Sequence, residues 1–375
     1  METYYEIKRI YRSKVAYFLI ALLALLITLP FFELPASETD VITSQYSLQL
    51  NSQKSTYNSL KNGHSNAEKE AVKKAKVNYD LIQKISENAT DGQIKSAEKN
   101  IYQFEKNNLN EMENKSIVGG NIFGQQMMVE QYGKNIKNTG KINLPARDLT
   151  ATAYISYLLT NLLPNSMIYI AFALITFNLF LPTSGLLGKR LILNRKFSKV
   201  SYLISKYLAS VGVFVGIIAV ILSAVFIVIG IKNGFGSFNV VSAFTVDFDK
   251  VVMLNFGDVI FKFFGITILN LSVMFSIGLL FQQFANNNLI QVVLEMMPFL
   301  FVGQKEILGF LQSFLPTASF DLRKTAFGYS WMDALGSSQN ITIDNSKIIV
   351  ISLLWIIVIV LIHLFLKSRT SKKLI

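Results

Sequence analysis

Few side chains in this sequence have the types and spacing that chemistry requires. There is no cysteine, and the two histidines, His64 and His363, lie far apart in the chain. A thiolate or imidazole cluster that could bind a metal or attack a substrate is therefore not expected. The sequence also lacks a G-x-x-x-x-G-K-[ST] loop, a nucleophile elbow and a His-Glu-x-x-His helix. We predict no catalytic residue, no metal site and no directly bound cofactor.

One acidic residue stands where its charge is costly. Glu295 interrupts the apolar run LIQVVLEMMPFLFV, about six residues or 9 Å from the start of that run. A carboxylate inside an apolar span marks a functional site by default, so Glu295 is a candidate for a translocation path. The alternative is a side chain that lies near the inner membrane interface and reaches water or a lysine. His363, near the end of another run, is predicted to be interfacial rather than a ligand.

The elements that must position these residues are apolar runs of membrane-spanning length. Hydrophobic residues make up 51% of the 375 residues, and the mean hydropathy is +0.39. About 20 apolar residues cross the hydrocarbon core as a helix. We therefore predict an all-α membrane protein with six transmembrane helices and a large helical extracellular insertion between the first and second spans. The predicted spans are 15–32, 163–181, 207–231, 259–281, 289–302 and 348–366, and the last five form one transmembrane domain over 151–375.

The basic residues indicate which way the spans point. They gather in 1–14, in the loop 182–206, which contains no acidic residue, and in the tail after 366. Short segments rich in lysine and arginine stay in the cytoplasm. We therefore expect a multi-pass protein of the plasma membrane with both termini cytoplasmic. The net charge of +12 then reflects topology and contact with membrane lipids, and nucleic acid is not an expected partner.

The polar insertion at 33–150 has helical periodicity. Ile94, Ala97, Ile101 and Phe104 recur at intervals of three and four residues, which is typical of a helix with one buried face. Long polar domains cross the membrane regardless of charge, so the insertion is predicted to lie outside. Segment 1–14 has apolar residues opposite basic ones, which favours a short amphipathic helix on the inner membrane surface.

Three segments resemble permease subunits of type-2 ABC exporters, the group that includes peptide and drug efflux systems of Gram-positive bacteria. They are YEIKRIYRSKVAYFLIALLALL, GLLGKRLILNRKFSKVSYLISKYLAS and MMPFLFVGQKEILGFLQSFLPTASFDLRK. The first is similar to the connecting helix of the family, the second to its coupling segment, and the third to a fifth span followed by a re-entrant outer segment, here 303–324. The loop departs from the family pattern, because no acidic residue precedes its glycine and position 199 is Lys where Arg is commoner.

The resemblance implies roles for individual residues. Coupling to the ATPase would involve Gly188, Leu191, Leu193, Arg195, Phe197, Ser198, Lys199 and Lys206. Pro298 would join Glu295 as a translocation-path candidate, and Gly303, Pro316 and Arg323 would shape the re-entrant segment. An amphipathic helix suits docking because its apolar face can enter a groove on a partner.

The resemblance also implies partners. ABC ATPase subunits would supply ATP and Mg²⁺, and a second permease copy, identical or related, would complete a dimer. The substrate would be an amphipathic peptide, a lipid or a drug. Two other functions remain open on the sequence alone. A non-transporting membrane receptor or scaffold would use the extracellular helical domain to bind a ligand or an envelope partner, whereas an intramembrane enzyme is disfavoured by the lack of a catalytic constellation.

Overall fold

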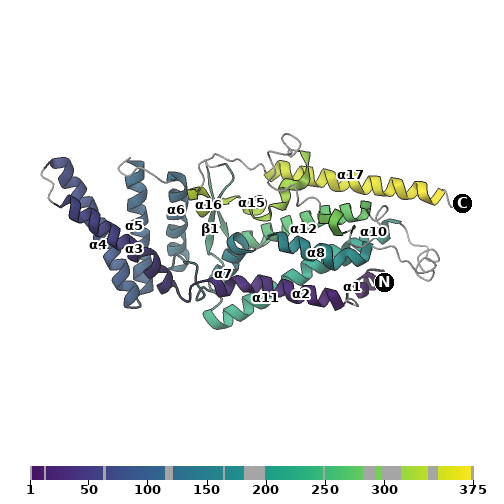
Figure 1. Ribbon diagram of the computed structural model, residues 1–375, viewed down its shortest axis with the longest axis horizontal. Coiled ribbons are helices and arrows are strands. Elements are labelled where there is room, and N and C mark those ends of the chain that lie inside the picture. The colour runs from purple at the N-terminus through teal and green to yellow at the C-terminus, as the bar shows by residue number, and fades with distance from the viewer. Residues whose placement is uncertain are drawn as a thin grey trace.

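The chain forms an elongated, mostly helical molecule (Figure 1). The computed structural model describes residues 2–11, 14–61, 65–114, 121–163, 165–180, 199–247, 250–281, 290, 292–296, 314–336 and 345–372. A helical domain occupies one end of the long axis, and the apolar helices extend to the other end, where both chain termini lie. A small sheet and short helices lie between the two parts.

The apolar helices agree in part with the predicted spans. They are α1 (Glu2–Tyr11), α2 (Lys14–Glu33), α8 (Asn165–Phe180), α10 (Lys199–Tyr207), the π-helix η2 (Leu208–Gly212), α11 (Val213–Asn233), α12 (Phe256–Phe281) and α17 (Asn345–Lys372). Four stretches are long and apolar enough to cross a membrane, namely Ala16–Glu33, Ser201–Asn233, Phe256–Phe281 and Ser346–Leu366. These features are those of a membrane protein. Most of the predicted fifth span, 289–302, lies outside the described residues.

The predicted second span, 163–181, corresponds to α8 (Asn165–Phe180), and a sharp bend separates it from the helix before it. Helix α7 (Ala151–Tyr157) continues as the π-helix η1 (Leu158–Leu162), and α8 follows at an angle of 86°. Counted together, Ala151–Leu162 and Ser166–Thr176 make a fifth candidate span. Pro164, the second residue after η1, explains part of the break because proline disfavours a helical conformation in the residue before it, and Leu163 is extended.

Helix α12 is the centre of the apolar part. In its most apolar 18-residue stretch, 72% is buried within the chain, whereas the corresponding stretches of the other three candidate spans are 17–28% buried. It packs against α17, α8, α7 and both π-helices. Exposed large residues include Phe18 on α2, Val220 on α11 and Phe261 near the start of α12. Such an apolar surface suits contact with lipid tails, because its exposure to water would be unfavourable.

The helical domain has its own core. Its helices are α3 (Glu38–Leu60), α4 (Asn66–Thr90), α5 (Ile94–Glu113) and α6 (Ile122–Thr139). Ser37 and Ser65 form capping boxes that start α3 and α4. Gly92 has a φ of +72° in the turn between α4 and α5. The predicted apolar stripe on α5 is confirmed, since Ala97, Ile101 and Phe104 are buried together with residues of α3, α4 and α6.

A three-stranded sheet in the order β2-β1-β3 departs from the all-α prediction. Strand β1 (Val241–Thr245) pairs antiparallel with β2 (Val251–Asn255) over its full length, from Val241↔Asn255 to Thr245↔Val251. Strand β3 (Tyr329–Ser330) pairs only with the last two residues of β1. The strands are too short to show a clear alternation in the sequence, and β3 comes from a distant part of the chain. Sequence periodicity therefore could not predict the sheet.

Short helices complete the region around the sheet. They are the 3₁₀ helix η4 (Pro316–Phe320), α15 (Leu322–Phe327) and α16 (Trp331–Gly336). A small apolar cluster of Met127 on α6, Ala243 on β1 and Ala334 on α16 connects the helical domain to the sheet. The two large parts of the molecule thus meet through a packed junction, and a change at this junction affects both.

Candidate functional site

Side-chain amides of α6 bind the open edge of β1. Beyond the two residues that β3 covers, Asn135 accepts a hydrogen bond from the Val241 amide at 2.8 Å and donates one to the Val241 carbonyl at 3.0 Å. Gln131 accepts from the Ala243 amide at 2.8 Å, and Asn138 donates to the Asn239 carbonyl at 3.0 Å. Residues at i, i+4 and i+7 share one helix face. This face of α6 therefore replaces a fourth strand and fixes the helical domain to the sheet.

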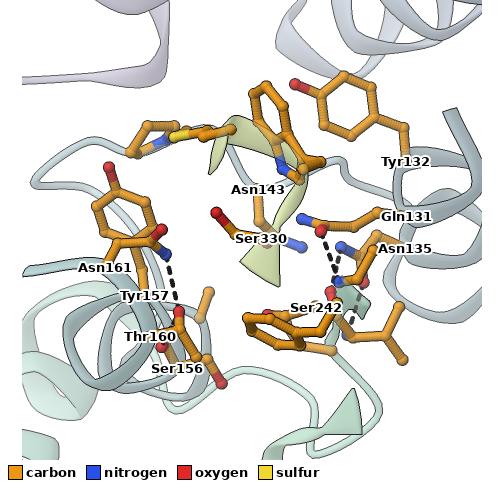
Figure 2. A pocket seen from close by; sticks show the side chains of 18 of the residues that line it. Gln131, Tyr132, Asn135, Asn143, Ser156, Tyr157, Thr160, Asn161, Ser242 and Ser330 are labelled. Atoms are coloured by element: carbon orange, nitrogen blue, oxygen red, sulfur yellow. Dashed lines mark hydrogen bonds between the residues drawn. The ribbon is translucent and has the colours of Figure 1, made fainter. Parts of the chain in front are cut away.

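A pocket of about 60 Å³ lies beside this contact (Figure 2). Its walls come from α6, the segment 143–145, α7 with η1, β1 and the start of α16. Two aromatic rings, Tyr132 and Trp331, meet edge to face with centroids 6.3 Å apart. The volume suits a few water molecules or one small chemical group. The pocket therefore lies where the helical domain, the sheet and the broken apolar helix meet.

The lining is polar but uncharged. It contains no Asp, Glu, Lys, Arg or His; its polar members include Asn143, Ser156, Thr160, Asn161, Ser242 and Ser330. Ser156 is 3% exposed, and its hydroxyl has no hydrogen-bond partner. The titratable side chains of the pocket are the phenols of Tyr132 and Tyr157, and burial raises the pKa of Tyr132. The pocket therefore holds no carboxyl, imidazole or amine group, and its hydroxyl and amide groups suit a neutral polar ligand.

The wall at Asn143 connects the pocket to a buried acidic group. Asn143 has a φ of +62°, a conformation that is uncommon outside glycine. On the other side of this segment, Glu98 is fully buried and accepts a hydrogen bond from the Ile142 amide at 3.1 Å. The pKa of Glu98 is raised to about 8, mainly because the carboxyl is buried and also because Glu38 repels its charge, while Lys141 and backbone hydrogen bonds lower it. Glu98 is therefore protonated at neutral pH.

The Glu98 carboxyl should make stability depend on pH. Its pKa is about 8 in the folded chain and near 4.5 when unfolded. Between these values the folded state binds the extra proton, so the free energy of unfolding falls as pH rises, by up to about 1.4 kcal/mol per pH unit. Glu98→Gln should remove this slope. We expect the thermal midpoint of Glu98→Gln minus that of the wild type to increase from pH 5 to 8 and then level off. A difference that stays constant with pH would contradict the assignment.

A second polar cluster lies inside the apolar part. Asn270 on α12 donates to the Tyr169 hydroxyl at 2.6 Å and to the Ser319 carbonyl at 2.6 Å. The Asn270 carbonyl oxygen and the Thr267 hydroxyl are buried without a hydrogen-bond partner. Buried polar atoms without partners are costly in an apolar interior. These atoms mark a polar seam between α8, α12 and η4.

Both π-helices pack against α12 close to these polar residues. Tyr207, just before η2, exchanges a hydrogen bond of 2.9 Å with Ser272 on α12. In the last turn of η1, the Asn161 carbonyl accepts a hydrogen bond of 2.8 Å from Arg323 on α15. Single π-turns inside α-helices are frequent at functional sites. The seam and the pocket are therefore flanked by helix segments whose hydrogen bonding is already irregular.

The structure places some of the predicted site residues and not others. Arg323 and Pro316 lie near the polar seam, with Pro316 at the start of η4. Glu295 is fully buried, so its carboxylate lies inside the packed protein rather than at an exposed interface. His363 is also buried, with Nδ1 2.8 Å from the Leu279 carbonyl near the end of α12, and its interfacial position stays a prediction.

Most of the predicted coupling residues lie in a segment that the structure does not describe. Gly188, Leu191, Leu193, Arg195, Phe197 and Ser198 lie outside the described residues, as do Pro298 and Gly303. Lys199 is the first residue of α10. Lys206 is 1% exposed, with Nζ 5.0 Å from the centre of the Tyr202 ring. Within this chain Lys206 therefore packs against its own helix, and its contact with an ATPase stays a prediction.

Sequence reasoning missed the pocket and the seam. Their residues come from distant segments that carry no shared motif, so nothing local marks them. The spacing of Gln131, Asn135 and Asn138 along one helix face was a signal that could have been read from the sequence. Amides at that spacing indicate a helix face that binds polar groups rather than an apolar core.

Known proteins offer no guide to this geometry. The chain matches no known family model, no curated protein and no solved structure. The function must therefore be argued from the residues themselves.

Proposed function

We propose that the chain is the membrane permease subunit of an ATP-driven ABC exporter in the plasma membrane. In this proposal the helical domain 33–150 is extracellular, both termini and the loop 182–206 are cytoplasmic, and a separate ATPase binds that loop. A second permease copy completes the complex. The substrate is an amphipathic molecule that passes outward along the apolar helices.

The observation that carries the proposal is the distribution of parts along the molecule. The helical domain lies at one end, and both termini lie at the opposite end (Figure 1). Helix α1 packs against α10, which forms the last part of the coupling loop 182–206, and against η2 and α8. The segment that resembles a connecting helix is thus in contact with the segment that resembles the coupling region. A displacement of α10 is therefore transmitted to α1 through direct packing.

The π-helices connect α10 to the rest of the apolar part and could transmit such a displacement. A displacement of α10 would act on η2 and then on α12, which contacts η1 and the polar seam. Helix segments with π-turns and buried polar atoms change their packing at lower cost than regular, fully satisfied helices. In the proposal, ATP-driven closure of the ATPase subunits moves α10, and α12 transmits the shift toward the extracellular end.

Substitutions in the loop test the docking step. Phe197→Asp or Leu191→Asp would place a charge in an apolar groove of the ATPase, and such burial costs several kcal/mol without a partner charge. We expect the ATPase to be lost from the tagged protein when it is purified in mild detergent. Mass spectrometry of the copurified chains measures the loss at matched membrane abundance.

A matched substitution keeps this test specific. Lys196→Gln removes a charge from the same loop, but a charge at the rim of an interface contributes modestly. We expect the ATPase to copurify with this variant nearly as with the wild type. If no ATPase copurifies with the wild type, or if both Asp variants retain it, the exporter proposal is wrong.

A receptor or scaffold is the second candidate function. The uncharged pocket at the junction favours it, because a ligand there would contact the helical domain and the broken apolar helix together. Under this alternative the chain would copurify with a ligand or an envelope protein, and the loop variants would behave like the wild type.

A further inference from the structure

The helical domain contains a second hollow, larger than the pocket at the junction. Its volume is about 270 Å³, and it lies between α3, α5 and α6. Its lining side chains include Gln49, Ser52 and Gln53 of α3, with Phe104, Asn108 and Gln125 opposite. No charged side chain is among its lining residues. We call this hollow the amide groove.

A buried carboxylate lies behind the amide groove. Glu105 is 8% exposed and does not line the groove itself. It accepts hydrogen bonds from the Tyr46 hydroxyl at 3.0 Å, from the Gln125 amide nitrogen at 2.9 Å and from the Asn108 amide nitrogen at 3.2 Å. All three donors are neutral. In the described part of the chain, no lysine or arginine forms an ion pair with Glu105.

These hydrogen bonds fix how the two amides are turned. Only the NH₂ end of an amide can donate to a carboxylate, so Glu105 holds the nitrogen ends of Asn108 and Gln125 toward itself. The carbonyl oxygens are then the ends available to the groove. These two amides therefore offer acceptors to the groove, beside Gln49, Ser52 and Gln53, and behind them lies the Glu105 carboxylate, which has no ion pair among the described residues.

Such a surface selects its ligand by charge and by hydrogen bonding. An ammonium group donates three hydrogen bonds, and its positive charge would be attracted by the Glu105 carboxylate. Phe104 and Met112 form an apolar wall for the carbons next to the ammonium group. The nearest lysines in the sequence, Lys54 and Lys106, are exposed, where solvent and salt screen their repulsion.

We propose that the amide groove binds an ammonium group carried beside apolar groups, such as a lysine side chain in an apolar peptide. A volume of about 270 Å³ admits one amino-acid side chain but is below the usual range for a whole drug-sized ligand. The groove thus recognises one cationic side chain at a time. This inference concerns binding by the helical domain and does not depend on transport.

Calorimetric titration of the full-length protein in detergent tests the proposal. The probe is acetyl-Leu-Lys-Leu-amide, and the comparison peptides carry norleucine or glutamate in place of lysine. We expect binding of the lysine peptide at least about tenfold tighter than of either comparison. Equal binding of the norleucine peptide would overturn the proposal. Butylammonium ion separates the sources: if it binds as tightly as the peptide, the ligand is a small amine, and if it binds more weakly, the ligand is a peptide.

Two pairs of variants assign the binding to this groove. Glu105→Gln should weaken binding of the lysine peptide about tenfold or more, whereas Glu130→Gln, at an exposed site on α6, should change it less than twofold. If Glu105→Gln does not fold, Ser52→Trp fills the groove from its exposed rim and should abolish binding. Ser47→Trp, exposed on α3 but outside the groove, is its control. Wild-type binding by Ser52→Trp would overturn the assignment.

Discussion

Gly328→Ala should destabilise the protein by about 3 kcal/mol or more. Gly328 has a φ of +93° and a ψ of −154°, a region that is essentially restricted to glycine. An added Cβ would also lie well inside van der Waals contact of the Thr245 carbonyl oxygen. Because β3 begins at the next residue and pairs with β1 there, the backbone cannot move away without breaking the sheet. Strain and overlap each cost about 1–3 kcal/mol.

A second glycine on the same side of the molecule serves as the control. Gly140 ends α6 with a φ of +76°, and no atom lies within 4 Å of where its Cβ would be. Gly140→Ala should therefore cost only about 1 kcal/mol, from the conformation alone. Thermal unfolding in detergent measures both, with Trp331 fluorescence as the local signal in a Trp355→Phe background. Equal effects of the two substitutions would show that the contact with Thr245 is not tight.

The sequence predicts the parts of this molecule whose energetics are local. A run such as 15–32 needs lipid along its whole length, so its apolar composition alone indicates a membrane-spanning helix. The stripe of Ala97, Ile101 and Phe104 is equally local, because one helix face must be buried. Both predictions are confirmed as helices, α2 and α5.

The parts that escaped prediction depend on contacts between distant segments. Strand β1 has an open edge that three amides of α6 complete, and no feature of 241–245 indicates which helix does so. The orientation of Asn108 and Gln125 depends on Glu105, whose burial is visible only in the folded domain. The bend after η1 depends in part on Arg323, which binds the Asn161 carbonyl from a helix far along the chain. Tertiary contacts of this kind override local preference.

Asn135→Ala should separate the helical domain from the sheet. Asn135 is 1% exposed, and its amide satisfies both the N–H and the carbonyl of Val241. Removing it leaves two buried backbone groups without partners, each at a cost of about 1–3 kcal/mol. We expect a loss of about 2–5 kcal/mol in stability, and faster hydrogen exchange in peptides that contain residues 240–245.

The neighbouring amide distinguishes a specific contact from general damage to α6. Asn138 makes one hydrogen bond, to the Asn239 carbonyl, at an exposed site, where water can replace it. Asn138→Ala should therefore cost less than about 1 kcal/mol and leave exchange at 240–245 nearly unchanged. If the two substitutions act alike, α6 is held by the apolar contacts of Met127 and Ala243 and not by its amides. In that case a movement of the apolar helices would reach the helical domain through packing alone, and the register between α6 and β1 would be free to shift.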